Sequence, residues 1–333
     1  MTISIAIPCY KSSKTIGAVV SEIRSVFQNS ENHDYQIVLV NDYPFDGTFE
    51  VIQQLCREDS KITGVNLSKN YGQTSAKMAA LPYVTGDVLV FMDDDGQHPA
   101  DGIIPLAEKV MEGYDVVYAH FKEKKHNFVK RFTSFINAKV LELNGSKQKG
   151  VHTSSFFAIS RLMVDACKDY QSPFPAMAGF INTLAGKTTE IDMDHRARLE
   201  GTSNYSLKKL LKFWLNGFTN FSIVPLRMIA MLGIIIAFCG FGFGAYVVIN
   251  KIVNPAVAAG YASLMAVFLF LGGLILIALG FIGEYIGRIY MTISGLQQYR
   301  VREVVQVKDP SDIKTAETVP GGAYEKTGNH RCE

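Results

Sequence analysis

The chain has 333 residues, of which 33 are Lys or Arg and 31 are Asp or Glu, and 48% of the residues are hydrophobic. This length allows one α/β domain and an additional segment, and the net charge of +2 without a basic stripe argues against a nucleic-acid partner. The cysteines are scattered without C-x-x-C spacing, which is typical of a reducing compartment and argues against structural zinc: Cys9, Cys56, Cys167, Cys239 and Cys332.

The first third of the chain alternates apolar strands with helices. We predict strands at residues 3–8, 36–41, 63–67, 88–93 and 115–119, and helices at residues 15–27, 47–57, 73–81 and 101–111. This βαβ alternation predicts the α/β class, with a parallel, doubly wound sheet. Ligands of such sheets bind at the carboxyl ends of the strands.

The segment VLVFMDDDGQHP, residues 88–99, ends a predicted strand in three consecutive carboxylates. Asp93, Asp94 and Asp95 repel one another unless a cation neutralises them, and hard oxygen ligands suit Mg²⁺ or Mn²⁺ carrying a diphosphate. Asp93 and Asp95 can share a side, and Gln97 can add a neutral oxygen or an outer hydrogen bond. The alternative is a solvated acidic turn that caps the helix starting near Pro99.

Two further strand ends carry polar or special residues. They are Pro8-Cys9-Tyr10 after the first strand and Asn41-Asp42 after the second. Because the carboxyl ends of parallel strands meet at one edge of the sheet, we expect these residues and the three aspartates to form a nucleotide site.

The middle of the chain is basic and then amphipathic. The sequence of residues 122–150 predicts a basic helical segment; the alternative is that its basic residues form an ordinary solvent-exposed helix face. The sequence of residues 154–160 predicts a returning strand. In residues 205–221, apolar side chains at helical spacing oppose Lys208, Lys209 and Lys212. This pattern predicts a helix in the membrane interface, with Trp214 at headgroup depth.

Two stretches without charged residues, 228–250 and 254–283, are each long enough to cross a bilayer as a helix. They are apolar all round, so we predict two membrane spans; the alternative is a buried hairpin of a soluble protein. Glycines in both stretches allow close helix packing in a homo-oligomer: Gly240, Gly242, Gly244, Gly272 and Gly273.

The flanking charges predict the orientation in the membrane. Basic residues lie before the first span and after the second, whereas the connecting loop holds only Lys251. No signal peptide precedes the first strand, so we expect a multi-pass protein of the cytoplasmic (inner) membrane with both termini and the catalytic domain in the cytoplasm. The predicted organisation is a catalytic domain (1–204), an interfacial helix (205–222), two spans (223–292) and a largely disordered tail (293–333).

Short motifs follow one another in a fixed order over residues 1 to about 305. They are P-x-Y (Pro8, Tyr10), the strand-ending Asp42, L-S-x-N-x-G (67–72), M-D-x-D-x-Q-x-P (92–99), R-x-x-G-x-S-x-Y (198–205) and P-L-R (225–227). This ordered set resembles the family 2 glycosyltransferases, and within that family the chain looks like the polyprenyl-phosphate sugar synthases, such as bactoprenol glucosyltransferase and dolichol-phosphate mannose synthase. The chain departs from the family pattern at Tyr43-Pro44, at Asp94 and at Asn204.

The resemblance implies an inverting GT-A domain that moves a sugar from a nucleotide diphosphate to a lipid phosphate. Pro8, Tyr10 and Asp42 would hold the base and ribose, and Asp93, Asp95 and Gln97 would hold the metal. Asp94, in the middle of the acidic motif, and Ser203, in the R-x-x-G-x-S-x-Y motif, are further substrate-binding candidates. Arg198 would contact phosphate, and Lys122, Arg131 and Ser134 would receive the lipid phosphate.

A lipid phosphate is already anionic at neutral pH, so it can attack the anomeric carbon without a strong general base. We therefore expect transfer of a sugar, glucose first among the candidates, from a UDP-sugar to polyprenyl (undecaprenyl) phosphate for cell-envelope glycan modification. A saccharide acceptor is the alternative, although a processive synthase lacks support because Trp214 is not in a Q-x-x-R-W motif. A non-catalytic membrane subunit with a relic nucleotide fold is a third interpretation.

Overall fold

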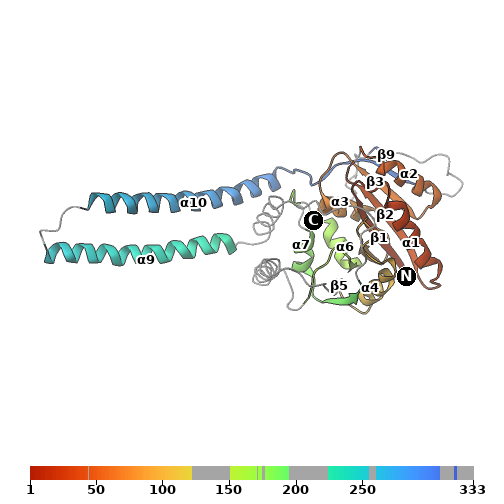
Figure 1. The fold of residues 1–333 in the computed structure, drawn as a ribbon, viewed down its shortest axis with the longest axis horizontal. Helices are drawn as coiled ribbons and strands as arrows, with labels where there is room; N and C mark the ends of the chain where they lie inside the picture. The colour runs from red at the N-terminus through yellow and green to blue at the C-terminus, as the bar shows by residue number, and fades with distance from the viewer. Residues whose placement is uncertain are drawn as a thin grey trace, which may run out of the picture. The chain divides into compact units, whose positions relative to one another are not determined.

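The computed structural model describes residues 1–43, 45–121, 151–170, 172–174, 177–194, 224–254, 260–307 and 319–320. The chain divides into two compact units, one of residues 1–204 with 297–333 and the other of residues 205–296. Many of the elements are labelled in Figure 1, and each unit is described by itself.

The first unit is built on a nine-stranded sheet with the strand order β7-β5-β6-β4-β1-β2-β3-β8-β9. The strands are β1 (Thr2–Cys9), β2 (Asp34–Asn41), β3 (Ile62–Leu67), β4 (Val88–Phe91), β5 (Val116–Phe121), β6 (Phe157–Ser160), β7 (Thr188–Met193), β8 (Val301–Gln306) and β9 (Val319–Pro320). The helices are α1 (Ile16–Gln28), α2 (Thr48–Glu58), α3 (Gln73–Ala80), α4 (Ile103–Met111), α6 (Arg161–Lys168) and α7 (Met177–Leu184), with 3₁₀ turns η1 (Leu81–Tyr83) and η2 (Ala100–Gly102).

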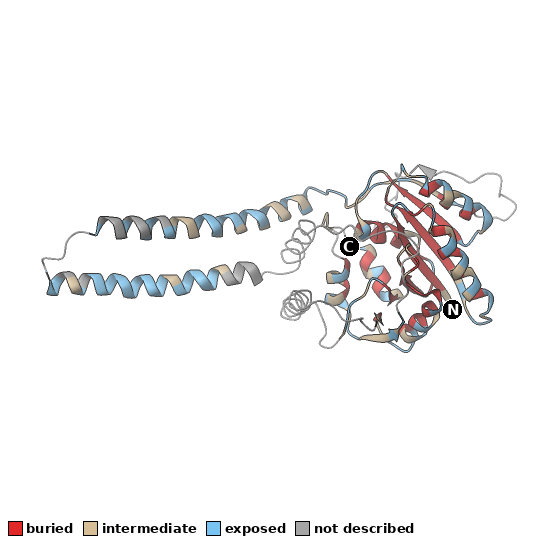
Figure 2. Ribbon diagram, in the orientation of Figure 1, coloured by how far each residue is buried: buried red, intermediate tan, exposed pale blue. Residues whose placement is uncertain are grey.

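Helices cover both faces of this sheet. On one face α1, α2 and α4 pack against side chains such as Ile5 and Leu39, and on the other α3, α6 and α7 pack against side chains such as Val40 and Phe91. The central strands are therefore buried on both sides, as their red colour in Figure 2 shows. This explains why their sequences are continuous apolar runs.

The predicted elements of the first 120 residues are confirmed, with ends shifted by a few residues. The sheet is mixed instead of wholly parallel: β1 to β4 are parallel, whereas β6 runs antiparallel to β4 and β5, and β8 antiparallel to β3. An apolar strand has the same sequence pattern in either direction, so the pattern could not reveal this. The returning strand predicted at residues 154–160 is β6.

Part of the predicted tail belongs to the catalytic-domain sheet. β8 follows the two long helices and pairs with β3. Val305 of β8 and Val307, which follows it, are both buried. The assignment of residues 293–333 to a separate tail was therefore wrong for this segment, because valine-rich alternation gives it a face to bury. The disorder expected from about residue 308 concerns residues that lie outside the described ones, apart from 319–320.

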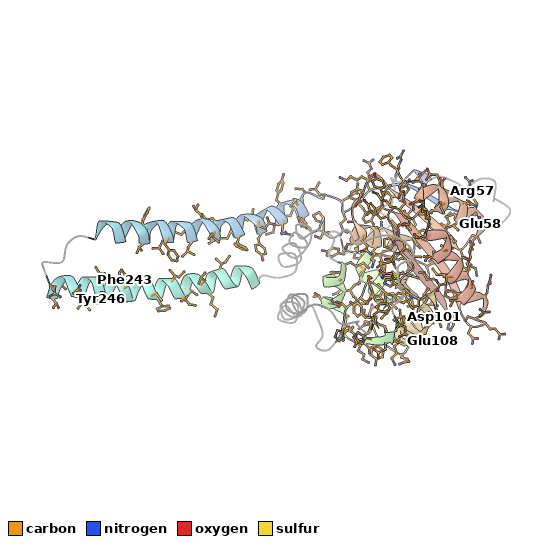
Figure 3. The ribbon with its side chains drawn as sticks, in the orientation of Figure 1. Arg57, Glu58, Asp101, Glu108, Phe243 and Tyr246 are labelled. Atoms are coloured by element: carbon orange, nitrogen blue, oxygen red, sulfur yellow. The ribbon has the colours of Figure 1, made fainter. Side chains whose placement is uncertain are left out.

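The second unit contains two long helices, α9 (Val224–Val253) and α10 (Tyr261–Ile293). Each includes a stretch long and apolar enough to cross a membrane, Ile229–Val247 and Phe270–Ile293. Large apolar side chains project outward from them, including Phe243 and Tyr246, which are labelled in Figure 3. The charges in α10 pair within the helix, with Arg288 Nη2 2.7 Å from Glu284 Oε1. The predicted interfacial helix, 205–222, lies outside the described residues.

Candidate active site

The ends of β1, β2 and β4 meet at one edge of the sheet. Cys9 lies opposite Asn41 in the β1–β2 register, and the backbone N–H of Asp42 donates to the carbonyl of Cys9 at 2.9 Å. On the other side of β1, the backbone N–H of Tyr10 donates to Asp94 Oδ2 at 2.9 Å. The residues that the sequence analysis placed at three strand ends are thus neighbours. Pro8 is buried within β1 directly before them.

Asp42 is buried at the end of β2 and anchors the loop after β3. Its two carboxylate oxygens accept the backbone N–H groups of Tyr71 and Gly72 at 2.7 and 2.8 Å. Gly72 has φ +91°, a conformation that a side chain would strain. Burial raises the pKa of Asp42 to about 6, and the two hydrogen bonds oppose this shift. The carboxylate therefore changes charge near neutral pH, which a surface aspartate does not.

A row of three aromatic rings lies at the ends of β1 and β2, with Tyr10 and Phe45 exposed and Tyr43 partly buried. Tyr10 and Tyr43 meet edge to face with ring centroids 5.5 Å apart, and Phe45 continues the row at 6.2 Å from Tyr43. Lys11, at φ +58°, places its ammonium 5.6 and 5.4 Å from the Tyr10 and Tyr43 ring centroids. Sequence reasoning named Tyr10 but missed Lys11, Tyr43 and Phe45. The departure from the family pattern at Tyr43 was the available signal.

Asp94, the middle carboxylate of the acidic run, faces the loop after β1. Its Oδ2 accepts the Tyr10 backbone N–H and the Ser12 hydroxyl. Burial raises the pKa of Asp94, while the hydrogen bonds from Ser12 and Tyr10 act in the opposite direction. Asp94 therefore fixes the loop that carries Tyr10 and Lys11.

Asp93 is oriented by hydrogen bonds on both carboxylate oxygens. Gln73 Nε2 donates to Oδ1 at 2.6 Å, and the Ser155 hydroxyl donates to Oδ2 at 2.7 Å. The Asp93 backbone N–H donates to Nδ1 of His98 at 3.0 Å. The His98 ring stacks on Phe156 and Phe121, with centroids 4.9 and 5.8 Å away. Side chains from α3, the acidic loop and the segment before β6 thus hold one carboxylate in place.

A buried lysine lies behind this carboxylate. Lys77 of α3 is 8% exposed, and its Nζ is 3.9 Å from Asp93 Oδ1 and donates to the Ser155 carbonyl at 3.2 Å. The ammonium also lies over the Phe91 and Phe157 rings. Burial lowers the pKa of Lys77, and the charge of Asp93 opposes that shift. Sequence reasoning missed Lys77, although a lysine within the apolar run Ala76–Ala80 was a signal.

Asp95 and Gln97 follow on a tight turn. Gly96 has φ +72°, and the Gln97 backbone N–H donates to Asp95 Oδ1 at 3.1 Å. The turn places Asp95, with its carboxylate, and Gln97, with its side-chain amide, close together in the loop after β4. Oxygens of these types are the ligands that Mg²⁺ and Mn²⁺ take in proteins.

The remaining predicted site residues lie outside the described part of the chain. These residues are Lys122, Arg131, Ser134, Arg198 and Ser203.

Comparisons with known proteins identify the family of the chain. Residues 4–167 match the family model "Glycosyl transferase family 2", and residues 224–289 match "GtrB C-terminal hairpin". The undecaprenyl-phosphate 4-deoxy-4-formamido-L-arabinose transferase of Aeromonas hydrophila is 30% identical over 315 residues, 91% of this chain and 94% of the relative. The uncharacterized glycosyltransferase YkcC of Bacillus subtilis is 31% identical over 86% of this chain and 89% of its own.

Among solved structures, glucosyl-3-phosphoglycerate synthase from Mycobacterium tuberculosis, in complex with Mn²⁺, UDP and glucosyl-3-phosphoglycerate, aligns with a TM-score of 0.46. It is 18% identical and covers 65% of this chain and 77% of its own.

The family match over residues 4–167 and the 30% identical relative, named a transferase, make this protein a glycosyltransferase. Its relatives match it along nearly their whole length. The chain belongs to glycosyl transferase family 2, and the resemblance stated from its motifs is confirmed.

Proposed function

We propose that the enzyme transfers glucose from UDP-glucose to undecaprenyl phosphate with inversion at the anomeric carbon. The observation that carries the proposal is the presence in one chain of an acidic strand-end site and of two helices with outward apolar side chains. Relatives in Aeromonas hydrophila and Proteus mirabilis are named as transferases that use undecaprenyl phosphate, which supports a lipid phosphate acceptor. The product would serve cell-envelope glycan modification.

The donor site would lie along the loop after β1 and the end of β2. Tyr10 and Tyr43 offer exposed ring faces and edges to a nucleobase, and Pro8 shapes the strand end beneath them. Asp42 would accept hydrogen bonds from the base or ribose. Its carboxylate is held by two backbone N–H groups, so it is already oriented before a donor arrives.

The acidic loop fits a divalent cation, Mg²⁺ or Mn²⁺. Asp93, Asp94 and Asp95 are adjacent carboxylates, and the Lys77 ammonium lies near one of them, Asp93. We assign Asp95 and Gln97 as the principal ligands. Asp93 would be a further ligand through the lone pairs that its hydrogen bonds to Gln73 and Ser155 leave available. When bound, the cation would offset the charge of the departing diphosphate.

The acceptor phosphate would be aligned by basic and hydroxyl side chains near the membrane. We assign this role to Lys122, Arg131, Ser134, Arg198 and Ser203. An Arg guanidinium can hold a phosphate through two hydrogen bonds at once. Because the acceptor is already anionic, these residues need only position it in line with the bond to the diphosphate.

We assign α9 and α10 as membrane spans, with residues 205–222 in the interface and the catalytic unit on the cytoplasmic side. Phe238 and Phe241 are 77% and 80% exposed on α9, an arrangement suited to lipid and costly in water. Close packing through the glycines of these helices would support a homo-oligomer.

The test is to incubate membranes containing the full chain with labelled UDP-glucose and undecaprenyl phosphate. We expect label in a lipid phosphate that is absent when Asp95→Ala replaces the wild type. Label in a polysaccharide would replace our acceptor with the saccharide alternative. Label in neither fraction, across a panel of UDP- and other nucleotide-linked sugars, would contradict the proposed function.

A further inference from the structure

Two histidines and two carboxylates meet at the β5–β7 edge of the sheet, outside the site described above. His120 lies opposite Asp192 in the strand register, with its Nδ1 2.8 Å from Asp192 Oδ1. His152, in the segment before β6, has its Nδ1 3.2 Å from Glu190 Oε2, and its backbone N–H donates to that oxygen at 2.7 Å. The two imidazole rings stack with centroids 4.5 Å apart.

The spacing of these groups suits a metal ion. One ligand atom from each of His120, His152 and Glu190 lies within 4.8 Å of the other two. Ligand atoms around a tetrahedral ion with bonds of about 2.1 Å are about 3.4 Å apart. The His152 side chain is 65% exposed, so rotation about its own bonds can close the difference without moving the strands.

The ligand chemistry selects the kind of ion. Imidazole nitrogens favour Zn²⁺, Co²⁺ or Ni²⁺ over Mg²⁺, which prefers an all-oxygen shell. Two neutral imidazoles and two carboxylates together carry a charge of about −2, which a divalent cation neutralises. Asp192 is placed to hold Nδ1–H of His120, which directs the other ring nitrogen, Nε2, to the ion.

We infer that His120, His152 and Glu190 form a second metal site for a zinc-class ion, with Asp192 orienting His120. The ion would link β5, β7 and the segment leading into β6, and so stabilise this edge of the sheet. That segment also carries Ser155, whose hydroxyl holds Asp93. The scattered cysteines argue against structural zinc only where thiolates are the ligands, and this site uses imidazoles.

The test uses the full chain, purified without a polyhistidine tag and stripped of metal. Co²⁺ is titrated in excess Mg²⁺, which occupies oxygen-only sites, and visible absorption reports nitrogen ligation. We expect one equivalent of Co²⁺ to bind and to raise the melting temperature. Loss of a residue that only orients a ligand costs about 10- to 100-fold in metal affinity, so His120→Ala, His152→Ala and Glu190→Gln, which remove direct ligands, should each weaken binding by at least that factor.

Glu108→Gln is the matched control. Glu108 is labelled on α4 in Figure 3, and its Oε1 lies 3.3 Å from His33 Nε2. This pair resembles the proposed site in joining a carboxylate to an imidazole, but it contains one histidine instead of two. This variant should bind Co²⁺ as the wild type does. If the His152→Ala variant, altered at an exposed loop position, binds Co²⁺ as tightly as the wild type, or if the wild type binds none, the second metal site does not exist.

Discussion

The Lys77 ammonium lies 3.9 Å from the Asp93 carboxylate, and the lysine approaches from the buried side of the site. Asp93 therefore has a cationic neighbour within the protein, in addition to its hydrogen bonds from Gln73 and Ser155. A lysine enclosed by Phe91 and Phe157 is costly to bury unless a carboxylate or carbonyl receives its protons. The two residues are thus expected to depend on each other.

Lys77→Met should lower the free energy of unfolding by about 1–3 kcal/mol, because it leaves Asp93 without its charged partner although Met fills the apolar space. Adding Asp93→Asn should recover much of that loss, since the unpaired charge is then gone. Thermal and denaturant unfolding of both single variants and the double variant measure this. Lys109→Met, at a partly exposed lysine on α4 that pairs with Glu112, is the control. Strictly additive losses in the double variant would show that Lys77 and Asp93 are not coupled.

Asp95→Ala should reduce transfer about 10²–10³-fold while leaving the melting temperature near that of the wild type, because its carboxylate is proposed to hold the cation. Chelation by EDTA should do the same and be reversed by Mg²⁺ or Mn²⁺. Asp165→Ala, at an exposed carboxylate on α6, serves as the control for a lost surface charge. Turnover that continues in EDTA would refute the metal assignment.

Asp94→Ala should weaken UDP binding about 10-fold, because it removes the acceptor that holds the Tyr10 N–H and the Ser12 hydroxyl. Asp94→Asn should be milder, since its amide oxygen can still accept one of these hydrogen bonds. Calorimetric titration with UDP gives both affinities. Equal affinities for all three proteins would mean that the loop after β1 does not shape the donor site.

The stability conferred by Asp42 should depend on pH. Its native pKa of about 6 lies above the ordinary value of 3.8, so the native state binds a proton that the unfolded state has released between these values. The wild type should therefore lose stability relative to Asp42→Asn as the pH rises from about 4 to about 6. Melting temperatures of both proteins across this range provide the measurement, and a difference that is constant with pH would contradict the raised pKa.

A chain that ends after Leu296 should have a less stable catalytic unit than one that ends after Val307. The shorter chain lacks β8, which exposes the edge of β3 and removes the buried Val305 and Val307 at a cost of about 3 kcal/mol. Melting of the two chains in the same detergent makes the comparison. Similar melting temperatures would show that β8 is dispensable for the sheet.

Much of the fold could be predicted because its signals are local. Continuous apolar runs such as Val88–Phe91 predicted the central strands, and the acids after them predicted the sheet edge at which we place the candidate site. The direction of β6 and the return of β8 to β3 depend on contacts between residues far apart in the sequence. Periodicity within one segment carries no information on such pairing.

In the candidate site, too, the residue types could be predicted from local sequence, whereas their contacts could not. Asp93, Asp94 and Asp95 look equivalent in the sequence, yet each faces a different partner because successive side chains on an irregular loop diverge. Lys77 and Ser155 reach Asp93 from a helix and a distant segment, so only the folded chain brings them together.

The return of β8 to the sheet also restricts how the chain can thread through a bilayer. Strands that precede α9 and a strand that follows α10 belong to one sheet. With α9 and α10 as the proposed membrane spans, the polypeptide would leave and re-enter the same aqueous compartment. Only an even number of crossings satisfies this closed path. Because β8 comes after both helices in the chain, the edge of β3 stays unpaired by β8 during synthesis until α9 and α10 have been made. Under the proposed topology, membrane insertion and completion of the sheet would be successive stages of one assembly process.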